Sequence, residues 1–198
     1  MSSPIVIVGA GLAGLTLARV LHIHDIPAIV LESDPTPTAR TQGGQLDIHE
    51  ESGQLAIALA GLSTEFRRLV NDGADSTRVL DSSGHVLFEQ GSRGVRPEVL
   101  RGDLRTMLLH SLPDDMVRWG AKVTGITKTA GSRWKLQLAG GAEVVSDLIV
   151  GADGAWSKVR PLVHDATPTY SGTTFIESYL HDVDVRHPRA AELVGPGA

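Results

Sequence analysis

The stretch "PIVIVGAGLAGLTLARVL", residues 4–21, decides the fold of this chain. Its β-branched opening, residues 4–8, is typical of a buried parallel strand. Three glycines follow in a G-x-G-x-x-G pattern, and apolar residues then recur at the spacing of a helix. A second β-branched run, "AIVLE", residues 28–32, ends at an acidic residue. The order of strand, glycine turn, helix, strand and acid predicts a dinucleotide-binding βαβ unit.

The glycines and the acid each have a mechanical reason in such a unit. Gly9 permits the tight turn, Gly11 lets the backbone approach a pyrophosphate, and Gly14 lets the helix pack closely on the strand. The N-terminus of the helix offers N–H groups and a partial positive charge to phosphates. Glu32, 18 residues after Gly14, can accept hydrogen bonds from both hydroxyls of an adenosine ribose. An acid there disfavours the 2′-phosphate of NADP at this site, so the pattern leaves NAD and the ADP half of FAD open.

Composition narrows the class of protein. The chain has 198 residues, a net charge of −5 and no cysteine, which excludes disulfides and thiolate metal sites and disfavours a nucleic-acid partner. No apolar run is long enough to cross a membrane, and "MSSP" lacks the positive segment of a signal peptide. The histidines are scattered, so no metal site is expected. These features predict a cytoplasmic protein with no membrane or nucleic-acid partner.

The middle of the chain mixes short strands and helices. Residues 46–48 read as a strand, and a helix is expected from an N-cap at Ser52 to Leu59, stopped by Gly61. Alternation predicts a β-hairpin over residues 77–90. The other expected elements are a helix over residues 97–112 and three strand-like runs over residues 117–129, 132–141 and 142–156.

Charged residues in this region allow two interpretations. On spacing alone, Arg40 and Asp47 read as solvated loop charges. Arg101 and Arg105 are four residues apart and share a helix face, which is either a solvated basic face or a contact for an anion or cofactor.

The stretch "LIVGADGAWSKVR", residues 148–160, carries a resemblance to a known family. Its strand, Gly-Ala-Asp-Gly turn and following helix opened by Ser157 and Arg160 resemble the Asp-Gly signature of the flavin-dependent aromatic hydroxylases. That family has the p-hydroxybenzoate hydroxylase fold. Three stretches resemble its tetracycline-inactivating branch: "GGQLDIHEESGQLAIALAGL", "LRGDLRTMLL" and "SDLIVGADGAWSKVR". In order and spacing, the whole resemblance runs from residue 4 to about residue 185.

The resemblance implies an α/β fold. Residues 1–165 are expected to form a Rossmann-like FAD-binding domain, a parallel sheet with an antiparallel β insertion. Residues 166–198 are expected to begin the β-sheet of a substrate domain, with a first strand in "TTFIESYLHDVDV", residues 173–185. The family's second FAD signature is absent, so we expect the chain to be an N-terminal portion of such an enzyme.

The resemblance also assigns site residues. Arg40 matches an arginine implicated in NADPH interaction, and Asp47 and Arg101 match FAD-contacting residues. No catalytic side chain is expected, and Arg105 is left as a structural or surface residue. The expected cofactor-binding residues are Gly9, Gly11, Gly14, Glu32, Arg40, Asp47, Arg101, Asp153 and Gly154.

The implied function is that of an FAD-dependent monooxygenase, an oxidoreductase that uses NADPH or NADH and O₂. Members of the family hydroxylate an aromatic or polyketide-like small molecule through a flavin C4a-hydroperoxide, and antibiotic resistance is the role of the tetracycline-inactivating branch. Glu177 falls where tetracycline-degrading members place a substrate-facing glutamine, which puts tetracycline itself in doubt.

Three other interpretations stay open. The chain could be a non-catalytic FAD- or NAD-binding module, or an inactive truncated product. An NAD-dependent reductase is a third, which the Asp-Gly stretch disfavours. Self-association or a complementing C-terminal half is expected to cover apolar surface.

Overall fold

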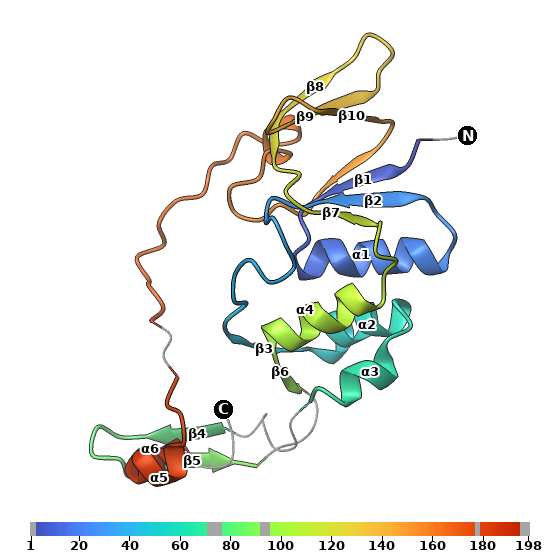
Figure 1. The fold of residues 1–198 in the computed structure, drawn as a ribbon. Coiled ribbons are helices and arrows are strands. Elements are labelled where there is room, and N and C mark those ends of the chain that lie inside the picture. The colour runs from blue at the N-terminus through green and yellow to red at the C-terminus, as the bar shows by residue number, and fades with distance from the viewer. Residues whose placement is uncertain (1–2, 71–76, 92–95, 177–178, 195–198) are drawn as a thin grey trace. The chain divides into compact units, whose positions relative to one another are not determined.

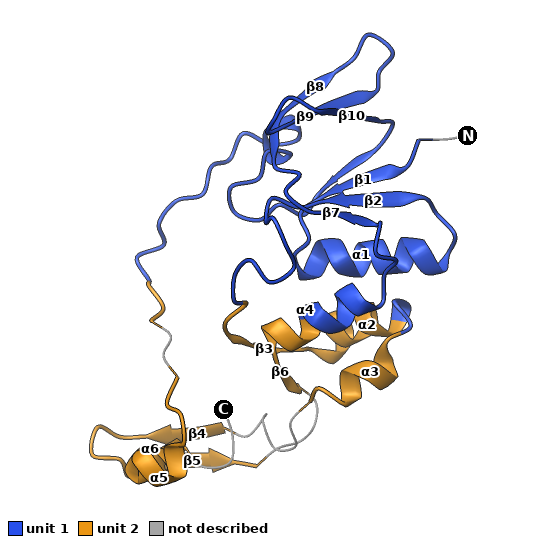
Figure 2. Ribbon diagram, in the orientation of Figure 1, with its two compact units in different colours: residues 1–41, 59–61, 105–173 blue, residues 42–58, 62–104, 174–198 orange. Residues whose placement is uncertain are grey.

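The computed structural model describes residues 3–70, 77–91, 96–176 and 179–194 (Figure 1). These residues divide into two compact units, coloured in Figure 2. Unit 1 comprises residues 1–41, 59–61 and 105–173, and unit 2 comprises residues 42–58, 62–104 and 174–198. The boundary between them falls inside helix α4 (Arg101–His110), after Leu104.

A four-stranded parallel sheet forms the centre of unit 1. Its strand order is β11-β1-β2-β7, so the first strand of the chain lies between two neighbours. In this register Val6 pairs with Ile149 on one side and with Ile29 on the other. The strands are β1 (Ile5–Val8), β2 (Ala28–Leu31), β7 (Val117–Arg118) and β11 (Ile149–Gly151).

Two layers cover the parallel sheet of unit 1. Helix α1 (Leu12–Ile23) joins β1 to β2 and packs against both strands. On the other side lies an antiparallel sheet of order β10-β9-β8, as the ribbon shows (Figure 1). Its strands are β8 (Val123–Lys128), β9 (Trp134–Leu138) and β10 (Glu143–Ser146). The predicted α/β fold with a parallel sheet and an antiparallel insertion is confirmed.

The core of unit 1 follows from the alternation of side chains along β1. Val6 and Val8 are buried in a cluster with Leu136 of β9, between the two sheets. Because successive side chains in a strand point to opposite faces, Ile7 faces the α1 side. Ile7 and Leu15 of α1 are both fully buried. A strand buried on both faces explains why β1 reads as an unbroken apolar run.

Unit 2 consists of small elements. Strands β3 (Gln45–Asp47) and β6 (Glu98–Leu100) pair antiparallel, as do β4 (Thr77–Leu80) and β5 (Val86–Gln90). The β4–β5 pair confirms the predicted hairpin. The helices of this part of the chain are a π-helical turn η1 (Glu50–Gln54), α2 (Leu55–Leu59), α3 (Ser63–Arg67), α5 (Val183–Arg186) and α6 (Pro188–Val194).

Two predicted helices begin at other residues. The helix expected from an N-cap at Ser52 is α2, and Ser52 lies inside the π-helical turn that precedes it. The helix expected over residues 97–112 is α4, which begins only at Arg101. It begins later because residues 98–100 form strand β6. Gly61 has a φ of +71°, which fits its predicted role as a helix stop.

Two predictions near the C-terminus are wrong. The described residues of 173–185 contain no strand, and this stretch enters α5 at Val183. A strand needs a neighbour for its N–H and C=O groups, and no pairing to this stretch occurs within the described residues. The helix expected after the Asp-Gly turn is only a 3₁₀ turn, η2 (Arg160–Leu162), since Pro161 restricts the chain there.

Within the ranges given above, no helix is long and apolar enough to cross a membrane. The same residues contain no group of three or more His, Asp or Glu side chains that could hold a metal ion.

Candidate functional site

The glycine loop between β1 and α1 contains two glycines that the fold itself requires. Gly9 has a φ of +104°, and a Cβ there would lie 2.4 Å from the carbonyl oxygen of Ala152. A Cβ on Gly14 would lie 2.0 Å from the carbonyl oxygen of Gly9. Both distances are far below van der Waals contact, so these positions admit no larger side chain. Gly9 and Gly14 therefore hold the loop, the helix and the Ala152 segment together.

Gly11 has no such structural requirement. Its φ of −76° is accessible to any residue, and nothing lies within 4 Å of the position that a Cβ would occupy. Gly11 is also the N-cap of α1, and no side chain caps the helix N-terminus there. The missing side chain leaves open space beside backbone N–H groups, which is the arrangement that binds phosphates.

Glu32 lies just beyond the C-terminal end of β2, and its side chain is bound to the glycine loop. The residue is 5% exposed. Its Oε2 accepts a hydrogen bond from the N–H of Ala10 at 2.6 Å. Its Oε1 accepts hydrogen bonds from the hydroxyl of Ser33 and from the N–H of Asp34, each at 2.9 Å. The structure thus brings the predicted acid and the glycine loop together, since β1 and β2 are neighbouring parallel strands.

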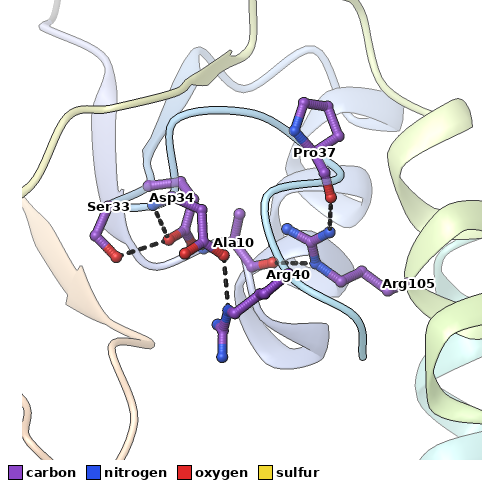
Figure 3. A network of polar contacts seen from close by, with 7 residues as sticks. Ala10, Ser33, Asp34, Pro37, Arg40 and Arg105 are labelled. Atoms are coloured by element: carbon purple, nitrogen blue, oxygen red, sulfur yellow. Dashed lines mark hydrogen bonds and ion pairs between the residues drawn. The ribbon is translucent and has the colours of Figure 1, made fainter. Parts of the chain in front are cut away.

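Arg40 extends the same network (Figure 3). Its Nε donates to Oδ2 of Asp34 at 2.8 Å, and this hydrogen bond and the negative charge of Asp34 raise the pKa of the guanidinium. The side chain of Arg40 is 65% exposed. The arginine is thus held at one end and open to solvent at the other, and its predicted contact with NADPH stays a prediction.

The Asp-Gly turn after β11 lies against the glycine loop through Ala152. The N–H of Ala152 donates to the carbonyl of Val8 at 2.8 Å. The carboxylate of Asp153 accepts hydrogen bonds from the hydroxyl of Ser157 and the N–H of Lys158, both at 2.6 Å. Gly154 has a φ of +75°, as the turn requires. Asp153 therefore builds the turn with its own side chain.

Asp47 and Arg101 lie in unit 2. Asp47 ends β3 and pairs with Glu98 of β6, while the N–H of Arg101, directly after β6, donates to the carbonyl of Gly44 at 3.0 Å. The two residues therefore belong to opposite ends of one two-stranded ladder, and both side chains are exposed. Their contact with FAD stays a prediction. Glu177 lies outside the described residues.

The sequence did not reveal the role of Arg105. This residue is 5% exposed, its Nε donates to the carbonyl of Ala10 at 3.1 Å, and its Nη1 donates to the carbonyl of Pro37 at 2.9 Å. Its guanidinium carbon lies 5.4 Å from the ring centroid of Trp119. Of the two roles expected for Arg105, structural residue and surface residue, only the first fits the structure, because the side chain is buried. The signal was its position next to the buried Leu104 on the apolar side of the helix.

The chain is similar to proteins named as monooxygenases along most of its length. It is 36% identical to the monooxygenase asqM of Emericella nidulans, over 98% of this chain and 47% of that protein. It is also 36% identical to the monooxygenase penA of Penicillium thymicola, over 98% of this chain and 48% of that protein. The chain thus spans about half the length of the curated relatives it matches.

Solved structures show the same fold. The tetracycline destructase Tet(51) is 27% identical, with a TM-score of 0.64 over 83% of this chain and 42% of that one. HpxO of Klebsiella pneumoniae, complexed with FAD and uric acid, is 24% identical, with a TM-score of 0.70 over 84% of this chain and 43% of that one. The family model described as an FAD binding domain matches residues 2–196. This protein belongs to the FAD-binding domain family.

Proposed function

We propose that unit 1 binds the ADP half of FAD, with the pyrophosphate at the glycine loop and the adenosine ribose at Glu32. The observation that carries this proposal is Gly11, whose Cβ position is open although the fold does not require a glycine there. The buried carboxylate of Glu32 accepts a hydrogen bond from the N–H of Ala10 in the same loop. Backbone N–H groups suit a pyrophosphate, and a carboxylate suits the two ribose hydroxyls.

We further propose that the whole protein is a monooxygenase that uses NADPH or NADH and O₂ on an aromatic or polyketide-like small molecule. FAD, when bound, supplies the electron transfer and the activation of oxygen. The support is the family and its named relatives, which include monooxygenases and a urate hydroxylase of Mycolicibacterium vanbaalenii. Within this chain, Arg40 offers a positive, exposed group for the phosphates of the nicotinamide cosubstrate, held in place by Asp34.

The variant Gly11→Ala tests the proposed FAD site without disturbing the fold. Because its Cβ meets nothing in the protein, we expect the free energy of unfolding to stay within about 1 kcal/mol of the original. The same Cβ would occupy the space beside a bound pyrophosphate, so FAD should bind about tenfold to a hundredfold more weakly. Urea unfolding gives the first quantity, and a titration of flavin fluorescence gives the second.

The same titration separates the alternatives. If the unsubstituted chain binds neither FAD nor ADP, the proposed site is contradicted. A folded Gly11→Ala variant with unchanged FAD affinity contradicts it as well. A nicotinamide-dependent reductase would bind NAD more tightly than FAD. A chain that binds FAD, but whose flavin neither NADPH nor NADH bleaches under anaerobic conditions, favours a binding module.

We also propose that a polypeptide like the second half of the relatives covers apolar side chains of unit 2. Phe175 and Ile176 are each 93% exposed, and Val185 is 83% exposed. Phe175 and Ile176 are neighbours in the sequence, and contiguous exposed apolar surface of this kind marks interaction sites in soluble proteins. We expect a 1:1 complex by light scattering when this chain is co-expressed with the unmatched second half of asqM. A homodimer that excludes that polypeptide, or a monomer that ignores it, would overturn the proposal.

A further inference from the structure

The N–H and the carbonyl of Ala10, in the middle of the glycine loop, are each bound by a buried charged side chain. Figure 3 shows the hydrogen bond from Arg105 to the carbonyl. The N–H of Ala10 donates to Glu32 at 2.6 Å, and its carbonyl accepts from Nε of Arg105 at 3.1 Å. Glu32 and Arg105 are each 5% exposed. The loop is thus fixed from one side by an anion and from the other by a cation.

Peptide geometry gives the bond from Arg105 a consequence for the neighbouring residue. The carbonyl of Ala10 and the N–H of Gly11 belong to one peptide group, and in a trans peptide these two groups point in opposite directions. The bond to Arg105 sets the direction of the carbonyl, so it also sets the direction of the Gly11 N–H. That N–H belongs to the residue beside the open space described above.

Arg105 is suited to hold this peptide because its guanidinium is itself fixed. Nη1 donates to the carbonyl of Pro37 at 2.9 Å, which joins the glycine loop to the segment that carries Asp34 and Arg40. The ring of Trp119 lies 5.4 Å from the guanidinium carbon, within the range of a cation–π contact. Lysine carries the charge but lacks the planar fork that reaches two carbonyls from fixed positions.

We propose that Arg105 is a positioning residue for the phosphate loop. It holds the Ala10–Gly11 peptide in the orientation that presents the Gly11 N–H to the pyrophosphate of a dinucleotide. The proposal rests on the proposed function, since it requires that FAD binds at this loop. It makes Arg105 important for affinity as well as for folding.

Arg19 of α1 provides a matched control. It also makes two hydrogen bonds to carbonyls, from Nε to Ala60 at 3.2 Å and from Nη1 to Ser111 at 2.8 Å. Arg19 is eight residues after Gly11, about 12 Å further along the helix axis at 1.5 Å per residue. Removing Arg19 therefore takes away the same kind of bond without touching the peptide between Ala10 and Gly11.

The test compares Arg105→Ala with Arg19→Ala in the full chain. We expect both variants to lower the midpoint of urea unfolding. Only Arg105→Ala should weaken binding of FAD and of ADP, by about tenfold to a hundredfold, the loss expected for one hydrogen bond to a charged group. Millimolar guanidinium should restore most of that affinity, whereas it should leave the FAD affinity of Arg19→Ala unchanged.

Each outcome has one meaning. If the original chain binds neither FAD nor ADP, the proposed function fails before any variant is compared. If the original binds FAD and both alanine variants weaken it equally, or Arg105→Ala binds FAD like the original, the positioning role is overturned. If Arg105→Ala does not fold, Arg105→Lys replaces it, with an expected weakening of FAD and ADP binding by at least about threefold. A folded lysine variant with unchanged affinity would overturn the role as well.

Discussion

Replacing Gly14 by alanine is expected to lower the free energy of unfolding by about 3 kcal/mol or more, a large fraction of the total stability of an ordinary domain. The added Cβ would lie 2.0 Å from the carbonyl oxygen of Gly9 and 3.2 Å from Cβ of Ala152. The Gly9 carbonyl has little freedom to move, because it shares a peptide group with the N–H of Ala10, which donates to Oε2 of Glu32 at 2.6 Å. Residue 14 is therefore a contact point between the helix and the loop.

The expected loss of stability in Gly14→Ala is opposite in sign to the change that helix propensity alone predicts. A change from glycine to alanine inside a helix ordinarily stabilises it by about 1 kcal/mol. Gly14 lies inside α1, so propensity alone predicts a gain, and the steric contact predicts a much larger loss. Soluble yield and the midpoint of urea unfolding measure the difference.

Two controls belong beside this variant. Gly11→Ala adds the same methyl group three residues earlier, where nothing lies within 4 Å, and should unfold at nearly the same urea concentration as the original. Ala13→Gly, at an exposed position of the same helix, should lower the free energy of unfolding by only about 1 kcal/mol, the difference in helix propensity between the two residues. A Gly14→Ala variant as stable as the original would show that the loop and the helix are not in close contact.

The elements that the sequence predicts correctly are those whose signals are local. The three glycines between an apolar strand and an apolar helix predict β1, α1 and the turn between them. Their spacing from Glu32 predicts β2 as well. In each case the pattern itself reports the constraint, because the turn, the helix packing and the strand burial all act on neighbouring residues.

The elements that the sequence predicts wrongly depend on distant partners. Strand β6 exists because residues 98–100 pair with residues 45–47 of β3, far away in the sequence, whereas their apolar pattern also fits a helix. The stretch 173–185 has the composition of a strand but pairs with no strand among the described residues. Helix periodicity places Arg105 beside buried residues, but it cannot show which carbonyls the guanidinium contacts, those of Ala10 and Pro37.

Replacing Glu32 by glutamine is expected to weaken FAD binding by about a hundredfold or more. If both hydroxyls of the adenosine ribose donate to this carboxylate, two hydrogen bonds to a charged acceptor are lost or weakened, at about 1.5–3 kcal/mol each. ADP should lose affinity by a similar factor, since it carries the same ribose. The variant also places an amide NH₂ against N–H donors of the loop, so a loss of about 1–3 kcal/mol in stability accompanies it.

If the ribose binds at Glu32 as proposed above, one of the hydrogen bonds that this carboxylate makes within the protein must open. A carboxylate has about four acceptor sites, and in Glu32 the protein fills three of them. Two ribose hydroxyls therefore need one site to be vacated. Two of the three donors are backbone N–H groups fixed by the chain, at Ala10 and Asp34, whereas the hydroxyl of Ser33 can rotate away to water. In the proposed site, the Ser33 hydroxyl is therefore the group that FAD is expected to displace.

Ser33→Ala is consequently the control that separates ribose binding from local structure. Because the serine bond is exchanged when the ligand arrives, its removal should leave the affinities for FAD and ADP within about threefold of the original. Isothermal titration with both ligands, on Glu32→Gln and Ser33→Ala in parallel, measures the contrast. If Ser33→Ala weakened FAD binding as much as Glu32→Gln does, Glu32 would act by holding the turn at residues 32–34 in shape rather than by binding the ribose. If Glu32→Gln bound FAD like the original, the ribose would be held elsewhere.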